Sequence, residues 1–351
     1  MEKQQQDNIQ ALKKALTEVA LGRQKFQEYL NLVHEPLTNC LVGCLQNSRT
    51  CFESEKHKDV DKYLYAPLMQ YLKNTGKLHR PALCLASFLM NGGNLEDIEP
   101  VVYVACAIEV FQAAALIHDD IADNATLRRN EKCFHLRHGL GIGINSGDFA
   151  LSMVVANTLL QLSKIGFSTE ITIDVISELS YMEYMTTEGQ AIDLGWARDE
   201  RFDLTVEDYF TMARKKTAYY SCSAPCVLGA LCAKASNSVV DSLREFGLTV
   251  GVAFQIQDDI LNLSQAGNKD FRNDITEGKR TLMVVHSLNN SSEKNKETLK
   301  KILTKHTKNS KKLENAVKII EQSGSFVYAN SLIAQLVNSA QDIIDNNYNN
   351  R

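Results

Sequence analysis

The chain has 351 residues, 44% of them hydrophobic, which allows one large domain or two smaller ones. Its formal net charge is −4 and its pI is near 6.1, so no overall basic field would attract nucleic acid. Nine cysteines, an odd number spread from Cys40 to Cys232, favour free thiols in a reducing compartment over a disulfide framework.

The sequence contains no segment that we expect to enter a membrane. The N-terminal stretch MEKQQQDNIQALKK carries acidic and amide residues where a signal peptide needs an apolar core. Nowhere do about 18 apolar residues follow one another without a charge. We therefore expect a soluble, cytoplasmic protein with no stable membrane insertion.

The pattern of apolar residues predicts an all-α protein. Only five prolines interrupt the chain, and no segment alternates apolar and polar residues persistently enough to indicate a sheet. We expect a single-domain bundle of long helices over residues 1–351, with its chemistry-bearing core at about 70–290.

The predicted elements follow one another along the chain as helices joined by polar connectors. Residues 1–60 are polar and compatible with helices. Helical spacing then covers 101–123, 147–162, 171–191 and 239–263. The stretch LGWARDERFD reads as a loop, and Gly267 and Asn268 as a turn. Thr205 and Asp208 resemble a capping box that opens a helix running through Lys216 toward Ala230.

The first acidic cluster ends the apolar helix over 101–123. Asp119, Asp120 and Asp123 lie at i, i+1 and i+4, so Asp119 and Asp123 stack one turn apart on the same helix face. A solvated helix face or a cap would also explain a single DDxxD pattern. Acids that end an apolar helix and point into a cleft, however, would be relieved mainly by a divalent cation.

A second cluster repeats this spacing with Asp258, Asp259 and Asn262. Mg²⁺ usually binds through one or two carboxylates and shares its other positions with water and substrate phosphate. Two such helix faces, if aimed at each other, could hold several ions around one diphosphate.

Basic residues accompany both acidic clusters, as a diphosphate ligand would require. Each alone reads as a solvated surface charge, but Arg binds phosphate bidentately and Lys binds it as a point charge. The grouped cations are Lys77, Arg80, Arg128, Arg129, Lys216, Lys269 and Lys279.

Seven segments of the chain together resemble a known family. They are GKLHRP, EVFQAAALIHDDIAD followed by RR, INSGD, EGQAID, KKTA, FQIQDDILN and DITEGKRT. In this order they resemble the trans-isoprenyl diphosphate synthases, the farnesyl and geranylgeranyl diphosphate synthase group of the polyprenyl synthetase family. The resemblance covers roughly residues 70–290, and it implies the all-α isoprenoid synthase fold around a central active-site cavity and a homodimer.

The resemblance implies a metal site and two substrate sites. Three Mg²⁺ ions would be held on an allylic diphosphate by Asp119, Asp120, Asp123, Asp258 and Asp259, with Asn262 in place of the usual third Asp. The residues matching allylic diphosphate contacts are Arg128, Lys216, Gln255 and Lys269. Those matching isopentenyl diphosphate contacts are Lys77, Arg80, Gln112 and Arg129. Asn130, Arg272 and Met283 replace common Gly, Gly and Pro residues, which bears on local loop shape.

The implied chemistry is head-to-tail prenyl transfer. Metal ions and cations stabilise the departing diphosphate, an allylic carbocation forms, and the isopentenyl double bond attacks it before a proton is lost. The oxygen dipoles of Thr217 and Gln190 resemble those that face the cation. No general-base histidine is needed, so His118 and His135 read as packing residues or neighbours of the site.

Product length is read from the helix before Asp119, where relatives that stop at fifteen carbons usually carry an aromatic. Ala114 and Ala115 are small, which leaves this floor open. Phe111 lies three residues deeper, about 4.5 Å, or one isoprene unit. The hypothesis is a C20 product, geranylgeranyl diphosphate, although Phe111 also fits an ordinary core aromatic. A farnesyl or longer polyprenyl product remains an alternative.

Three readings of other classes compete with this one. A terpene cyclase would need a second motif of the form Asn/Asp-Asp-x-x-Ser/Thr-x-x-x-Glu, which FQIQDDILN does not fit. A noncatalytic regulatory subunit of a prenyl synthase predicts damaged acidic motifs, and here only Asn262 deviates. An acidic, metal-buffering helical protein would leave the placed Lys and Arg residues unexplained.

Overall fold

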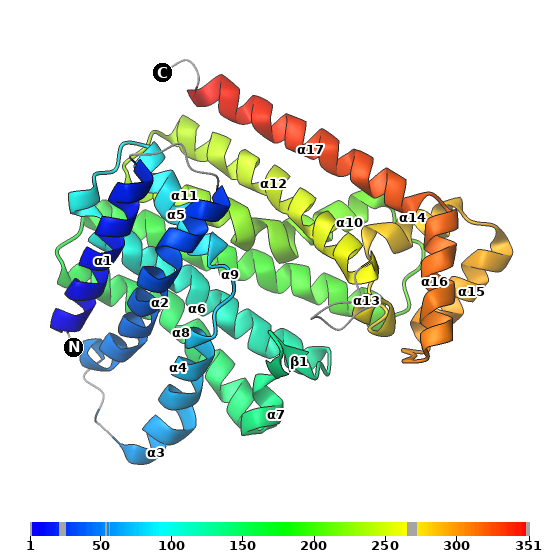
Figure 1. The fold of residues 1–351 in the computed structure, drawn as a ribbon, viewed down its shortest axis with the longest axis horizontal. Helices are drawn as coiled ribbons and strands as arrows, with labels where there is room; N and C mark the ends of the chain where they lie inside the picture. The colour runs from blue at the N-terminus through cyan, green and yellow to red at the C-terminus, as the bar shows by residue number, and fades with distance from the viewer. Residues whose placement is uncertain (1, 21–25, 53–54, 56, 265–271, 349–351) are drawn as a thin grey trace. The chain divides into compact units, whose positions relative to one another are not determined.

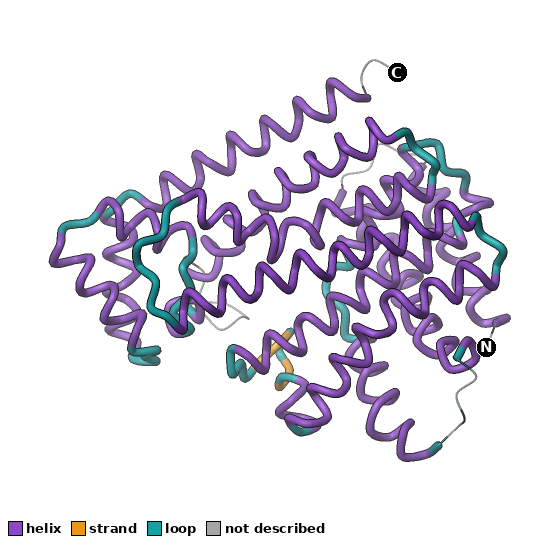
Figure 2. The backbone as a smooth tube through the Cα atoms, turned by 180° about the vertical axis from the view of Figure 1, so that it is seen from behind, coloured by secondary structure: helices purple, strands orange, loops and turns teal. Residues whose placement is uncertain are grey.

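The computed structural model describes residues 2–20, 26–52, 55, 57–264 and 272–348. Over these residues the chain is almost entirely helical, and its only strands are two antiparallel strands of two residues each (Figure 2). The all-α prediction is therefore confirmed. Backbone contacts divide the chain into two compact units, a first unit of residues 1–181 and 224–241 and a second unit of 182–223 and 242–351.

The first unit holds the N-terminal helices, the helix that ends in the first acidic cluster, and the strand pair after it (Figure 1). Its elements are α1 (Glu2–Ala20), α2 (Phe26–Cys51), α3 (Lys58–Val60), η1 (Asp61–Tyr65), α4 (Ala66–Lys73), α5 (His79–Met90), η2 (Leu95–Asp97), α6 (Glu99–Ala122), β1 (Leu127–Arg128), β2 (Glu131–Lys132), α7 (Phe134–His138), α8 (Leu140–Lys164) and α11 (Ala224–Cys232).

The second unit holds the second acidic cluster and the C-terminal helices. Two long helices, α9 (Thr169–Arg198) and α12 (Asn237–Ser264), begin in the first unit and end in the second. The remaining elements are α10 (Val206–Ala213), the π-helix η3 (Arg214–Ser223), α13 (Asn273–Thr276), α14 (Leu282–Asn290), α15 (Glu293–Thr304), α16 (Ser310–Gln322) and α17 (Ser325–Tyr348).

Helix α6 forms the apolar centre of the first unit. All residues from Val101 to Ala114 are buried, and α6 packs chiefly against α8. By length and composition α6 could cross a membrane, but 83% of its most apolar window is buried inside the structure. It is therefore a core helix.

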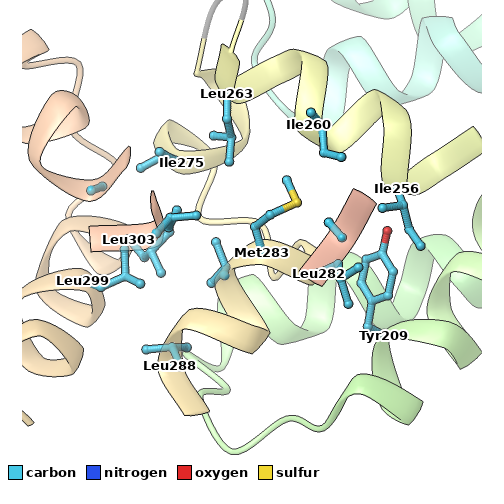
Figure 3. Packing of buried hydrophobic residues seen from close by; sticks show 14 of the residues in the cluster. Tyr209, Ile256, Ile260, Leu263, Ile275, Leu282, Met283, Leu288, Leu299 and Leu303 are labelled. Atoms are coloured by element: carbon cyan, nitrogen blue, oxygen red, sulfur yellow. The ribbon is translucent and has the colours of Figure 1, made fainter. Parts of the chain in front are cut away.

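A separate apolar cluster forms the core of the second unit (Figure 3). Met283 is fully buried in this cluster, and Tyr209 extends from α10 toward Ile256 and Leu282. The cluster includes residues of α12, which carries the second acidic motif, and of α10 and α14, which precede and follow α12 in the chain.

The local predictions are mostly confirmed, with one correction. Thr205 and Asp208 form the predicted capping box at the start of α10. The predicted loop LGWARDERFD is wrong in its first half, because α9 continues to Arg198 and the helix-compatible residues Trp196 and Ala197 extend it. The predicted turn at Gly267 and Asn268 lies outside the described residues.

Candidate active site

The two acidic motifs lie in different units, and each has its own surroundings. The first motif occupies the C-terminal end of α6, and the second lies on α12.

In the first motif an arginine holds two of the aspartates. Arg128 donates from Nε to Oδ1 of Asp120 at 2.9 Å, and its Nη2 contacts the same oxygen and lies 3.7 Å from Oδ2 of Asp119. Asp120 is fully buried, which raises its pKa, whereas the hydrogen bonds and charge of Arg128 lower it. The other oxygen of Asp120, Oδ2, is buried without a hydrogen-bond partner among the described residues.

Asp123 is the C-cap residue of α6, where its N–H donates to the carbonyl of Asp119 at 2.9 Å. Both residues are half-buried, whereas Asp120 between them is enclosed. The helix geometry thus presents Asp119 and Asp123 outward and turns Asp120 toward Arg128.

The predicted isopentenyl diphosphate residues lie in the first unit. Arg129 has a positive φ of 53°, its Nη1 donates to the carbonyl of Asn74, and its guanidinium lies 6.0 Å from the Tyr71 ring centre. Arg80 is buried at the start of α5. The side-chain oxygen of Gln112 is buried and lacks a hydrogen-bond partner in the described part of the chain.

Glu109 is a member of this group that the sequence did not single out. It is buried on α6, one turn before Gln112, and burial raises its pKa while Arg80 and Arg129 lower it. The signal was present in EVFQAAALIHDD, since a carboxylate in the middle of an apolar helix requires a nearby cation. Glu109 therefore balances the charge of the two arginines.

In the second motif Asp259 is held by two neutral donors. The hydroxyl of Tyr209 donates to Oδ2 at 2.8 Å, and Nε2 of Gln255 donates to Oδ1 at 2.6 Å. Asp259 is 3% exposed, and burial raises its pKa. Burial and the neighbouring Asp259 also raise the pKa of Tyr209, so its hydroxyl stays protonated. Asp258 is half-buried.

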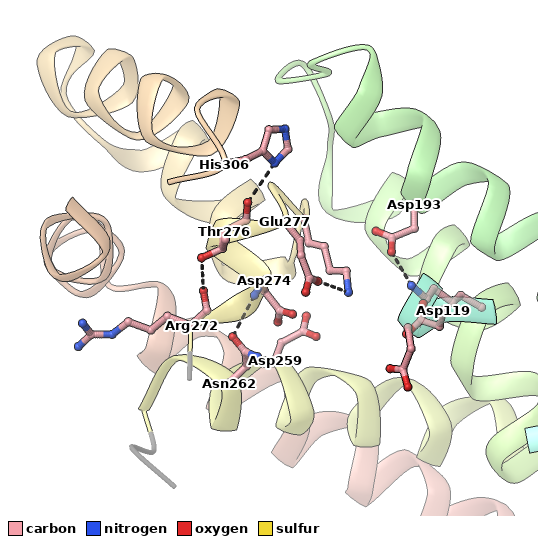
Figure 4. A network of polar contacts seen from close by, with 12 residues as sticks. Asp119, Asp193, Asp259, Asn262, Arg272, Asp274, Thr276, Glu277 and His306 are labelled. Carbon is pink, nitrogen blue, oxygen red and sulfur yellow. Dashed lines mark hydrogen bonds and ion pairs between the residues drawn. The ribbon is translucent and has the colours of Figure 1, made fainter. Parts of the chain in front are cut away.

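Asp274 adds a further carboxylate to this group (Figure 4). Burial raises its pKa to about 6; Asp258 and Asp193 add to the rise, and Lys279 and Lys216 oppose it. The side-chain oxygen of Asn262 accepts the backbone N–H of Asp274 at 3.3 Å and so ties α12 to α13. That oxygen is the one a metal would use.

The predicted cations of the second unit lie in ion pairs. Lys216 pairs with Asp193, and Lys279 lies 2.6 Å from Oε2 of Glu277. Sequence reasoning assigned no role to Asp193 or Asp274, although the segments EGQAID and DITEGKRT contain them. Lys269, which was predicted to contact the allylic diphosphate, lies outside the described residues.

The π-helix η3, which carries Lys216 and the buried Thr217, is packed closely against glycines. A Cβ at Gly189 on α9 would lie 2.1 Å from the backbone nitrogen of Lys216. On α12, a Cβ at Gly251 would lie 2.5 Å from Cα of Ala218. Only glycine allows backbones to approach this closely, and π-helical turns are frequent at functional sites. The glycine of EGQAID thus sets the position of Lys216.

The three departures from the family pattern have structural accounts. Asn130 and Arg272 both have a φ of 64°, the left-handed region that favours glycine. The loops therefore keep a glycine-like conformation without glycine. Met283 lies inside the apolar core of the second unit.

The residues read as the chain-length floor differ in exposure. Ala114 and Phe111 are buried, whereas Ala115 keeps accessible surface. Phe111, Ala115 and Asp119 follow one another at four-residue spacing on one face of α6. Ala115 is therefore the better placed of the two alanines to border a substrate tail.

The carboxylates fit magnesium better than a closed metal cage. Within the described ranges, no three His, Cys, Asp or Glu side chains are arranged to hold a metal by themselves. Mg²⁺ does not need such a cage, because it takes few protein oxygens and shares water and phosphate. Oδ2 of Asp120 is buried without a hydrogen-bond partner among the described residues, and Asp258 and Asp193 add to the rise in the pKa of Asp274; a cation would stabilise the ionised carboxylate at both places.

Comparison with known proteins places this site in a family. The pattern of the polyprenyl synthetase family matches residues 61–320, a range that contains both acidic motifs. The chain belongs to the polyprenyl synthetase family. The resemblance inferred from the seven segments is confirmed, and the chain is a trans-prenyltransferase.

Relatives and solved structures agree with this assignment. The chain is 35% identical over 273 residues to a geranylgeranyl diphosphate synthase of Saccharolobus solfataricus, with 73% of the chain and 76% of the relative covered. It is 32% identical over 324 residues to the corresponding synthase of Sulfolobus acidocaldarius, with 91% and 90% covered. A geranylgeranyl pyrophosphate synthase structure from Corynebacterium glutamicum, complexed with isoprenyl diphosphate and magnesium, has a TM-score of 0.78 at 26% identity, with 88% of this chain and 92% of that chain covered.

The glycine contact predicts the effect of one methyl group. Gly189→Ala should lower kcat on the order of 100-fold, because the added Cβ displaces the backbone that positions Lys216. Steady-state prenyl-transfer kinetics would measure it. Gly195→Ala is the matched control. Gly195 lies on the same helix, and a Cβ there would meet nothing within 4 Å. Equal activity of the two variants would contradict this account.

Proposed function

We propose that the protein is a Mg²⁺-dependent prenyltransferase that condenses isopentenyl diphosphate head-to-tail with an allylic diphosphate, giving geranylgeranyl diphosphate. The observation that carries the proposal is the first acidic motif, in which Asp119 and Asp120 end a buried apolar helix beside Arg128. An apolar helix that ends in carboxylates and a guanidinium suits a substrate with a hydrocarbon tail and a diphosphate head.

The chain's own residues would divide the work of binding between the two substrates. Arg80 and Arg129 would bind isopentenyl diphosphate, with Glu109 fixing the balance of charge around them. Arg128 and Lys216 would bind the allylic diphosphate as their aspartate partners release them to the anion. Thr217 would direct its oxygen dipole at the positive charge that develops on the allylic carbon.

The acidic residues would serve magnesium. Bound Mg²⁺ supplies Lewis-acid stabilisation of the departing diphosphate. Asp119 and Asp123 of the first motif and Asp258 of the second are the half-buried carboxylates with access to an ion. The buried Asp120 and Asp259 are held by protein donors and keep each motif in shape.

The product length is proposed from α6. Ala115 offers no obstacle to a tail that passes Asp119, and Phe111, four residues before it, would stop the chain after about one further isoprene unit. The relatives include synthases of geranylgeranyl and of geranylfarnesyl diphosphate, so a stop of this kind decides between C20 and C25.

Removal of magnesium should abolish turnover. A chelator in excess should reduce prenyl transfer to background, and added Mg²⁺ should restore it; retained activity would contradict the mechanism.

Asp119→Ala should lower kcat on the order of 100-fold or more, because one stabilising charge at the leaving group is lost. Asp342→Ala removes an exposed carboxylate from α17 and should leave kcat unchanged.

The floor of the product site can be raised by one side chain. Ala115→Phe should shorten the main product from C20 to C15, as measured by mass spectrometry with primers of five, ten and fifteen carbons. Ala114→Phe is the companion variant, and it should cost about 1–3 kcal/mol of stability because Ala114 has no accessible surface. Shortening by Ala114→Phe alone would show that the floor lies at Ala114 instead.

We also propose that a second copy of the chain covers an apolar face of α8. Its exposed or half-buried members recur at helical spacing and are Leu140, Ile144, Leu151, Val155 and Leu159. The exposed Asp148 lies on the same side of α8 between Ile144 and Leu151, so this face is mostly but not wholly apolar. A mostly apolar side of a helix is typical of an interface.

Sedimentation velocity should give the mass of two 39.3 kDa chains. Ile144→Glu should convert the dimer to monomer, because it places a charge within the apolar face, whereas Val327→Glu on α17 should not. A monomeric wild-type protein would refute the dimer.

A cytoplasmic location is proposed on chemical grounds. The eight cysteines whose side chains are described are all buried and form no disulfide, which suits a reducing compartment.

A further inference from the structure

Asp259 is anchored through both of its carboxylate oxygens. Oδ2 accepts the hydroxyl of Tyr209 at 2.8 Å, and Oδ1 accepts Nε2 of Gln255 at 2.6 Å. Gln255 lies one turn earlier on the same helix, α12, so its hydrogen bond moves with that helix. Tyr209 comes from a different helix, α10, and is therefore the contact that fixes Asp259 relative to the rest of the second unit.

Tyr209 is itself held in one position. Its side chain is fully buried in the apolar core of the second unit, near Ile256 and Leu282 (Figure 3). The capping box of Thr205 and Asp208 fixes the start of the short helix that carries it. A phenol ring enclosed in this way can direct its hydroxyl toward only one place, which here is Asp259.

The two anchors fix the carboxyl group of Asp259 and leave part of its hydrogen-bonding capacity unused. Tyr209 and Gln255 are both neutral donors, and a carboxylate has about four lone-pair directions, of which they occupy two. The remaining lone-pair directions of Asp259 are thus left for a divalent cation, directly or through a water molecule. An arginine in the same place would compete with the cation, as Arg128 does beside Asp120 in the first motif.

We propose that Tyr209 is a positioning residue for the second acidic motif. Its hydroxyl holds Asp259 in the orientation in which the motif binds a divalent cation together with a diphosphate. This inference rests on the proposed function, and it assigns to a core tyrosine a role in metal affinity. Outer hydrogen bonds of this kind orient metal-binding carboxylates, and their loss typically weakens metal affinity about 10- to 100-fold.

The test removes one oxygen atom. Tyr209→Phe keeps the ring in the core and deletes the hydrogen bond to Asp259. The Mg²⁺ concentration for half-maximal prenyl transfer should rise about 10-fold or more, while KM for isopentenyl diphosphate stays unchanged. Without turnover, the increase in Tm caused by Mg²⁺ and inorganic pyrophosphate should be smaller in the variant than in the wild type.

Tyr103→Phe is the matched control. Tyr103 is also buried, and its hydroxyl donates to Oε1 of Glu99 at 2.9 Å, but Glu99 belongs to neither acidic motif. This variant should lose a partly buried tyrosine–carboxylate hydrogen bond without any change in its Mg²⁺ response. A change equal to that of Tyr209→Phe would overturn the proposal, because any buried hydroxyl would then have the same effect.

A second variant and a double mutant complete the test. Gln255→Met removes the other anchor of Asp259 and should also weaken the Mg²⁺ response. Because Gln255 is only half-buried, this variant can replace Tyr209→Phe if the latter is too unstable to purify. In an Asp259→Asn background, Tyr209→Phe should cause no further loss of Mg²⁺ affinity.

Three outcomes would overturn the inference. A Tyr209→Phe enzyme with the Mg²⁺ dependence of the wild type would refute it, as would a further loss of Mg²⁺ affinity in the double mutant. A wild-type protein with neither prenyl transfer nor a Tm response to Mg²⁺ and pyrophosphate would refute the proposed function and this inference together. In the first two outcomes the wild type is active, so the failures are distinguishable.

Discussion

The arrangement of this protein depends on how it holds carboxyl groups inside helical, largely apolar surroundings. A buried charge is costly unless hydrogen bonds or an opposite charge stabilise it. Each acidic motif meets this constraint differently. Asp120 is held by a guanidinium from the loop after its own helix, whereas Asp259 is held by a phenol and an amide. The first motif is thus held by a charged donor and the second by neutral donors, a difference that the similar spacing of the two motifs does not reveal.

Close backbone packing is the second requirement. The cation-bearing segment of the second unit is a π-helix, whose wider turns put backbone atoms where a regular helix would not. Glycines on α9 and α12 make room for it. The same stretch of α9 also carries Glu188 and Asp193, which pair with Lys215 and Lys216. This short stretch of α9 therefore determines both how closely η3 approaches and which charges face its two lysines.

Much of this could be predicted from the sequence, and the limits have physical reasons. Helical periodicity located α6 and α12, and the Thr205–Asp208 pair located the start of α10, because these signals are local. The spacing of the aspartates placed both acidic motifs on helix ends or faces. The hydrogen bond from Tyr209 to Asp259 joins residues 50 positions apart, and no local pattern encodes it. Likewise, the left-handed conformation of Arg272 could not be read from a residue type that usually avoids it.

The buried cysteines make the two units chemically unequal. Of the eight cysteines whose side chains are described, seven lie in the first unit and only Cys222 lies in the second. Burial raises the pKa of Cys84 and of Cys232, so neither thiol presents a reactive thiolate in the folded state. An alkylating reagent can therefore react with these thiols only after the helices around them separate. The rate of alkylation then measures how often the first unit opens.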